Sequence, residues 1–269
     1  MEPGRVDRSQ LLHGVELSWW EQGAGPSVLC LHETASSGEI WRSLADALGE
    51  GARAIAPDRR GWGSSGAPEP YSATTIEEQA EDCAALIAEL DAAPAVACGA
   101  GLGAVVALDL LLRRGDLVRG AVLVEPPLLA FLPEATEGLS ADRAALADAV
   151  AGGGPEAAID LYLSGGLPFA GAGAARLPAP IAAVARERPL SLFAELGAVP
   201  AWPLRASQMH TVAAPSRVVV GSGTPAPLRT AADRLAEALG GGEPVVLDGE
   251  GLPHVSSAPE LARVVAALL

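Results

Sequence analysis

Three residues with side chains that can accept or donate protons are Glu33, Glu125 and His254. Each follows shortly after an apolar run that predicts a buried strand. An imidazole titrates near neutral pH, so His254 could serve as a general base or acid. Glu125 could orient that imidazole, as the third member of a catalytic triad does. Glu33 could act as a base if an apolar pocket raises its pKa. These residue types predict acid–base chemistry, with His254 and Glu125 as the catalytic pair.

Each of these residues also has a structural interpretation, which stays open at this point. His254 could be a surface histidine or one that contacts a cap. Glu125 could be a strand-end carboxylate held by backbone N–H groups, and Glu33 a turn residue bonded to neighbouring amides.

Residues 99–103 read Gly-Ala-Gly-Leu-Gly and lie between a short apolar run at 95–98 and a helical pattern that begins at Leu102. A strand, a turn of small residues and a helix form a nucleophile elbow, whose central residue should be Ser, Cys or Asp. Here the centre is Gly101, which has no side chain and cannot form a covalent intermediate. We therefore expect the architecture of an elbow without its reagent, with Gly101 leaving room for substrate.

Apolar runs alternate with amphipathic stretches along most of the chain. This pattern predicts an α/β fold, a mostly parallel sheet flanked by helices on both faces. The expected strands are 15–20, 28–31, 53–57, 95–98, 121–124, 217–220 and 244–247. The expected helices are 74–90, 102–113, 228–239 and 259–269.

The interval 128–211 breaks this alternation, because it has helical patterns at 141–150 and 180–196 and no strand pattern. We expect it to be an inserted helical cap that follows the sixth strand. The predicted domains are therefore a core of 1–127 and 212–269 and a cap of 128–211. Phe193 and Trp202 of the cap are expected to line an apolar pocket against the core.

The composition limits the partners that this chain can have. Its 269 residues carry a formal net charge of -15, so neither nucleic acid nor an anionic membrane is expected to bind. Three cysteines and a polar N-terminus indicate a cytoplasmic protein without a disulfide framework. No residue cluster has metal-ligand spacing and no phosphate-binding loop is complete, so no metal and no cofactor are expected. The composition leaves the oligomeric state open.

Four parts of the sequence together resemble the α/β-hydrolase superfamily over essentially the whole chain. They are 29–34 with Trp41, 56–65, 99–103, and 215–221 with 249–259. In that order they resemble the family's His-Gly loop, its Asp-x-x-Gly-x-Gly-x-Ser turn, its elbow, and the segments that hold its acid and histidine. The resemblance implies an oxyanion hole formed by the backbone N–H groups of Leu102 and Thr34.

The departures from the family pattern concern the catalytic residues. Glu33 stands where the His-Gly loop usually has Gly, which puts a carboxylate beside the pocket. The usual acid position reads Gly-Ser-Gly-Thr at 221–224 and has no carboxylate, while Glu125 occupies the family's other acid position. The usual histidine position falls on Leu252, so His254 would reach the site through a two-residue shift.

Three functions fit these features. The first is cofactor-independent proton transfer next to a carbonyl (epimerisation, elimination or cyclisation) on a small-molecule or modified-peptide intermediate of natural-product biosynthesis. Its base would be His254, a carboxylate or a group of the substrate, and the bottromycin-pathway peptide epimerase is similar in kind. The second is a hydrolase that activates water directly through His254. The third is a small-molecule-binding protein without turnover. We rank them in this order, because acid and nucleophile are both missing while the pocket frame is retained.

Overall fold

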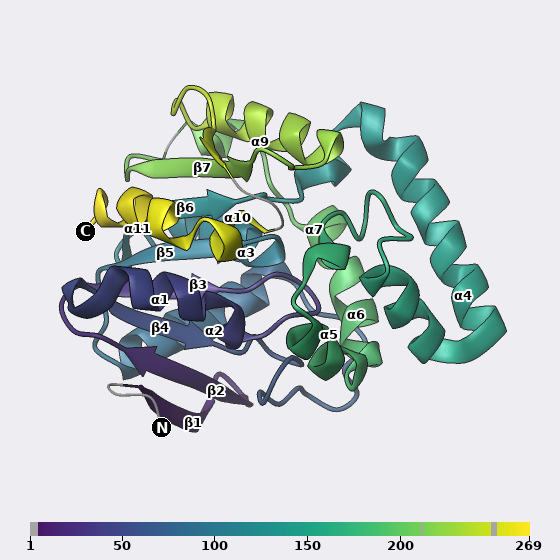
Figure 1. The fold of residues 1–269 in the computed structure, drawn as a ribbon, viewed down its shortest axis with the longest axis horizontal. Helices are drawn as coiled ribbons and strands as arrows, with labels where there is room; N and C mark the ends of the chain where they lie inside the picture. The colour runs from purple at the N-terminus through teal and green to yellow at the C-terminus, as the bar shows by residue number, and fades with distance from the viewer. Residues whose placement is uncertain (1–4, 211, 249–251) are drawn as a thin grey trace.

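The structure, a computed structural model, describes residues 5–210, 212–248 and 252–269 and shows one eight-stranded sheet flanked by helices (Figure 1). The strand order is β1-β2-β4-β3-β5-β6-β7-β8. The strands are β1 (Val6–Leu12), β2 (Val15–Gln22), β3 (Ser27–Leu31), β4 (Arg53–Pro57), β5 (Ala95–Ala100), β6 (Val118–Val124), β7 (Ser216–Gly221) and β8 (Val245–Leu247). Strand β2 runs antiparallel to β1 and β4, and the other neighbouring strands are parallel. The predicted α/β fold with a mostly parallel sheet is confirmed.

The sequence analysis missed only the edge strand β1 among these strands. Its burial pattern explains the omission, because every residue before Leu12 is exposed and no apolar alternation marks the strand. The strand is held by its backbone pairing with β2, which no pattern of side chains reports.

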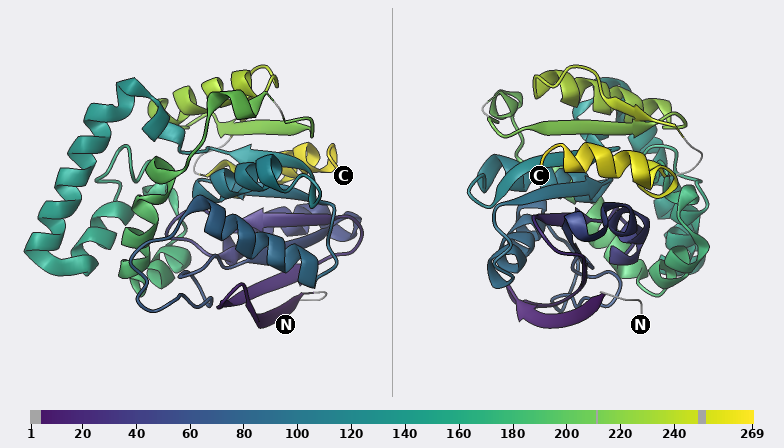
Figure 2. Two further views of the ribbon diagram at one scale, coloured as in Figure 1. Left: turned by 180° about the vertical axis from the view of Figure 1, so that it is seen from behind. Right: turned by 60° about the vertical axis from the view of Figure 1, so that its left-hand side comes forward.

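Helices cover both faces of the sheet, as expected for parallel strands with crossover connections (Figures 1 and 2). One core cluster joins the sheet to α2 (Ile76–Glu89), α3 (Leu102–Arg113) and α9 (Ala226–Ala238). The other joins it to α1 (Arg42–Leu48) and α11 (Ala258–Ala266). The short helix α10 (Pro253–Ser256) leads into α11. Thr75 caps α2, since its side chain accepts the N–H of Glu78.

A helical segment connects β6 to β7 and lies to one side of the sheet (Figure 1). Its helices are α4 (Thr136–Leu163), α5 (Ala179–Arg186), α6 (Pro189–Leu196), α7 (Ala198–Ala201) and α8 (Ala206–Met209), with the 3₁₀-helices η3 (Leu128–Phe131), η4 (Pro133–Ala135) and η5 (Ala174–Arg176). Helix α4 breaks at Gly153 and Gly154, whose backbone angles are not helical. We call residues 128–211 the cap, and its boundaries as a domain stay a prediction.

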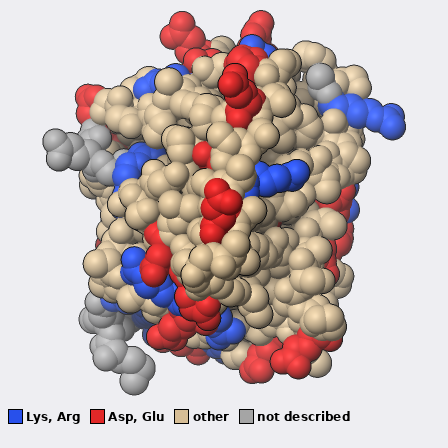
Figure 3. Space-filling model, turned by 90° about the vertical axis from the view of Figure 1, so that its right-hand side faces the viewer, with Lys and Arg blue, Asp and Glu red and all other residues tan. Residues whose placement is uncertain are grey.

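On the side of the cap that Figure 3 shows, the surface has no large patch of only positive or only negative charge. Acidic and basic side chains are interspersed there on a mainly uncharged surface. Within the described ranges no helix has the length and apolar character needed to cross a membrane. The same ranges contain no group of three or more His, Cys, Asp and Glu side chains placed to hold a metal ion.

Candidate active site

The turn between β5 and α3 has the backbone of a nucleophile elbow. Gly101 adopts φ 52° and ψ -126°, and its N–H donates to the carbonyl of Val124 at 3.0 Å. This positive φ is unfavourable for residues that carry a side chain. Gly103 permits the close approach of helix and strand, since a Cβ there would lie 2.2 Å from the carbonyl oxygen of Leu31. The strained turn of an elbow is therefore present, with Gly101 at its centre.

Glu33 fills the space where a side chain at position 101 would begin. A Cβ built on Gly101 would lie 2.6 Å from the Cβ of Glu33 and 3.3 Å from its Cα. Two carbons pack favourably only at about 3.5–4.0 Å, so a larger residue at 101 requires Glu33 to move. The two departures from the family pattern are thus spatially coupled, which the sequence analysis did not foresee.

The carboxylate of Glu33 lies against the imidazole of His254. Glu33 Oε2 is 3.4 Å from His254 Nε2. His254 lies on α10 and is buried, with its ring centroid 4.8 Å from that of Trp41. Within the described residues, neither carboxylate oxygen and neither ring nitrogen makes a hydrogen bond. The structure therefore brings together the two residues that the sequence analysis proposed as separate candidate bases.

Glu125 makes different contacts from those that the sequence analysis expected. Its carboxylate pairs with Arg176 of η5, with Arg176 Nη2 and Glu125 Oε2 2.8 Å apart, and accepts a hydrogen bond from the Thr224 hydroxyl. Thr224 occupies the position at which the family usually has its catalytic acid. In this chain that position carries a hydroxyl, which donates to Glu125. Across the described part of the chain, no hydrogen bond or ion pair joins Glu125 to His254. The expected Glu125–His254 pair is not assembled here.

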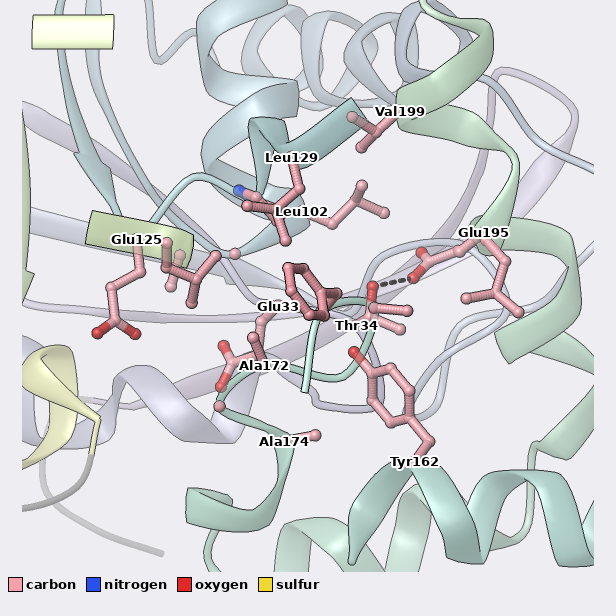
Figure 4. Close-up of a pocket in the computed structure, with 18 of the residues that line it drawn as sticks. Glu33, Thr34, Leu102, Glu125, Leu129, Tyr162, Ala172, Ala174, Glu195 and Val199 are labelled. Carbon is pink, nitrogen blue, oxygen red and sulfur yellow. Dashed lines mark hydrogen bonds between the residues drawn. The ribbon is translucent and has the colours of Figure 1, made fainter. Parts of the chain in front are cut away.

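The two expected oxyanion donors directly follow Gly101 and Glu33 in the sequence. Leu102 is the first residue of α3, where an N–H group has no acceptor within the helix. Thr34 is held from the cap, because its hydroxyl donates to Glu195 Oε2 at 2.7 Å (Figure 4). Glu195 also forms an ion pair with the buried Arg59. A cap carboxylate thus positions the loop that carries the second donor.

His32, next to Glu33, is a structural residue of the same loop. Its Nε2 accepts the backbone N–H of Arg59 at 2.9 Å, and its Nδ1 lies 2.7 Å from the carbonyl of Glu33. Burial lowers the pKa of His32 well below its ordinary value, so its imidazole is neutral. It therefore fixes the backbone of the Glu33 loop instead of titrating beside it.

A cavity of about 140 Å³ lies between the carboxyl ends of the strands and the cap. Glu33, Thr34, Gly101, Leu102, Glu125 and His254 all line it. Apolar residues form most of the remaining wall, and the aromatic lining comes from Tyr162 and Phe169. Burial raises the pKa of the Tyr162 hydroxyl, so this group is a neutral proton donor at neutral pH.

The structure places the predicted pocket aromatics Phe193 and Trp202 elsewhere. Trp202 is buried and donates its Nε1–H to Asp109 at 2.9 Å. Phe193 packs against the core cluster that contains α1 and α11. Neither residue lines the cavity. Composition alone marks the cap as apolar, but it does not indicate which aromatic faces the core.

Known proteins provide an independent comparison. A family model described as "Alpha/beta hydrolase family" matches residues 11–264. An epoxide hydrolase from Caballeronia sordidicola is 36% identical over 118 residues, which is 44% of this chain and 36% of that protein. The matches cover less than half the length of the first curated relatives.

Solved structures share the fold across nearly the whole chain. An esterase from Thermogutta terrifontis superimposes with a TM-score of 0.75 at 19% identity, covering 97% of each chain. An epoxide hydrolase from Vigna radiata superimposes with a TM-score of 0.74 at 21% identity, covering 99% of this chain and 98% of that one. These low identities establish a shared fold alone. Together with the family match and the elbow backbone, they establish that this chain belongs to the alpha/beta hydrolase family.

Proposed function

We propose that the protein is a hydrolase of small, largely apolar substrates in which Glu33 and His254 supply the chemistry. The observation that carries the proposal is the 3.4 Å approach of Glu33 Oε2 to His254 Nε2 at the wall of the cavity, beside Gly101. With the carboxylate next to the imidazole, the pair can accept a proton from water. The water becomes a nucleophile without any side chain at 101.

The comparisons support hydrolysis over the proton transfer that the sequence analysis ranked first. The curated relative and the solved structures described above are named as epoxide hydrolases and an esterase. The cavity supports a small neutral substrate, because its lining is mainly apolar apart from a few convergent polar groups.

Proton transfer next to a carbonyl is the second candidate, with the bottromycin-pathway epimerase as its analogy. One observation favours it: Gly101 offers no nucleophile, while the helix N-terminus at Leu102 could hold the negative oxygen of an enolate. Glu33 or His254 would then remove a carbon-bound proton. A modified-peptide substrate belongs to this candidate. If the protein catalyses neither reaction, the remaining function is the binding of a small molecule without turnover.

The test is product analysis with neutral epoxides, simple esters and lactones, run with the wild type, Glu33→Gln and His254→Gln. We expect hydrolysis by the wild type and a loss of about 10²–10⁴-fold in either variant, the range for general acid–base groups. Glu89→Gln and His210→Ala are matched controls, because both residues are exposed and distant in sequence from Glu33 and His254. Exchange of carbon-bound hydrogen for deuterium without hydrolysis would favour the second candidate. Binding without either reaction would contradict both.

A further inference from the structure

We propose that Glu33 is a covalent nucleophile that replaces the missing elbow nucleophile, and that its substrate is a neutral epoxide. The inference rests on the proposed function, which is hydrolysis in this cavity. It adds the attacking atom and the substrate class.

The Glu33 side chain lies where an elbow nucleophile would have to begin. Its Cβ is 2.6 Å from the place where a Cβ of residue 101 would stand. The side chain of Glu33 therefore begins almost where that of an elbow nucleophile would begin. It ends with Oε2 3.4 Å from His254 Nε2, and a nucleophile must have its base within such reach. A carboxylate thus occupies the nucleophile's place although it comes from a different loop.

The Glu33 carboxylate lies in an environment that offers it few hydrogen-bond donors. Both of its oxygens are buried without a hydrogen bond among the described residues, and its near polar neighbour is the imidazole of His254. Burial of an ionised group without hydrogen bonds is costly, so a purely structural residue at this position would be unfavourable. Few donors also leave the oxygen lone pairs free for attack. Glu33 and Gly101 both line the cavity, so attack on a substrate there requires the carboxylate to rotate away from His254.

The chemistry of a carboxylate nucleophile indicates which class of substrate it would attack. Attack on an ester carbonyl would give an anhydride, which is more reactive than the ester that formed it. Attack on the saturated carbon of a strained ring gives an ordinary ester and releases the ring strain. A small, mainly apolar cavity whose attacking group is the Glu33 carboxylate therefore favours a neutral epoxide over an acyl substrate.

In the first step a Glu33 oxygen forms a bond to one ring carbon, and the bond from that carbon to the ring oxygen breaks. The electron pair stays on the ring oxygen, which takes the proton of the Tyr162 hydroxyl. Tyr162 lies on α4, lines the cavity and points its hydroxyl toward it (Figure 4). The products are a hydroxyalkyl ester of Glu33 and a tyrosinate.

In the second step His254 removes a proton from water, and the hydroxide attacks the carbonyl carbon of the Glu33 ester. The bond from that carbon to the alkyl oxygen breaks, and the leaving oxygen takes the proton from His254. The diol departs and Glu33 is left as a carboxylic acid. Its proton returns through solvent to Tyr162, so the sum is epoxide plus water giving diol.

The test is a single turnover with excess enzyme in H₂¹⁸O, with styrene oxide as the neutral epoxide. Attack by Glu33 predicts a first-turnover diol without label and a peptide containing residue 33 that is heavier by one heavy oxygen. In His254→Gln we expect the ester to accumulate, as a mass increase of one epoxide on that peptide. In Glu33→Gln we expect loss of both signals, with circular dichroism and thermal midpoint reporting that the variant is folded.

The outcomes separate this inference from the proposed function. Label in the first-turnover diol and an unlabelled peptide would overturn Glu33 as nucleophile while hydrolysis stands. Hydrolysis of esters or lactones with no reaction of the epoxide would overturn the substrate class and the nucleophile together. No hydrolysis of any probe would remove the proposed function, and this inference would fall with it.

Discussion

Glu33 and Gly101 exclude one another's side chains: a Cβ at position 101 would lie 2.6 Å from the Cβ of Glu33. A side chain at 101 therefore requires residue 33 either to shift or to be small, and a small residue there is the usual arrangement of the family's His-Gly loop. The chain has the opposite arrangement, with the side chain on the loop and the glycine at the elbow.

The first prediction is that the two positions are energetically coupled. Gly101→Ser should destabilise the protein by about 2–4 kcal/mol, from a side chain at positive φ and from the collision with Glu33. In Glu33→Gly/Gly101→Ser the collision is gone, so the double variant should recover part of that loss. Chemical denaturation of the four proteins in the cycle gives the interaction energy. Additive effects within about 0.5 kcal/mol would show that the residues do not compete for space.

The second prediction concerns gain of a serine nucleophile. Gly101→Ser alone should remain inactive toward activated esters, because Glu33 occupies the space its side chain needs. Glu33→Gly/Gly101→Ser should gain measurable ester cleavage, since His254 lies within reach of this part of the cavity. Adding His254→Gln to the double variant should abolish the gain. Cleavage by the single variant at the rate of the double one would contradict the prediction.

The sequence was sufficient to predict the fold because the strands β2 to β8 are marked by their own apolar runs. It also placed Glu33, Gly101 and His254 near one pocket, through the order of the strands that precede them. It did not reveal that Glu33 lies against both of the others. That contact depends on distances of a few ångströms between loops remote in sequence, and no periodicity encodes them. The aromatics Tyr162 and Phe169 were missed for the same reason, since the face that a cap helix presents depends on its packing.

The third prediction concerns pH and His32. Burial lowers the pKa of His32 in the folded state below its ordinary value of 6.5, so the unfolded chain binds more protons as the pH falls through that value. The contribution of this residue to stability is therefore present above about pH 6.5 and is lost below it, by at most about 1.4 kcal/mol per pH unit. Denaturation of the wild type and His32→Gln between about pH 5 and pH 8 measures the difference. Parallel pH profiles of the two proteins would contradict it.

The fourth prediction compares two ion pairs. Glu195 pairs with Arg59, and both side chains are buried. Glu195→Ala should cost about 3–5 kcal/mol of folding free energy, because it leaves a guanidinium buried without its partner. Glu134→Ala removes an exposed pair with Arg234 and should cost at most about 1 kcal/mol. Thermal and chemical denaturation of the two variants provide the comparison. Equal losses of folding free energy would mean that the Glu195–Arg59 pair does not stabilise the contact between cap and core.

The fifth prediction separates Glu125 from Glu33. Glu125 bonds to Arg176 and Thr224, so it holds η5 at the cavity wall, and among the described residues it makes no hydrogen bond or ion pair with His254. Glu125→Gln keeps an acceptor for the Thr224 hydroxyl but removes the charge facing Arg176. It should raise KM about tenfold while leaving kcat within a few-fold of the wild type, because binding is weakened and the reacting groups are retained. Glu33→Gln should instead lower kcat. If Glu125→Gln lowered kcat as strongly as Glu33→Gln, then Glu125 would act on His254 during turnover as the sequence analysis expected, and the contacts of Glu125 with Arg176 and Thr224 would have to open when substrate binds.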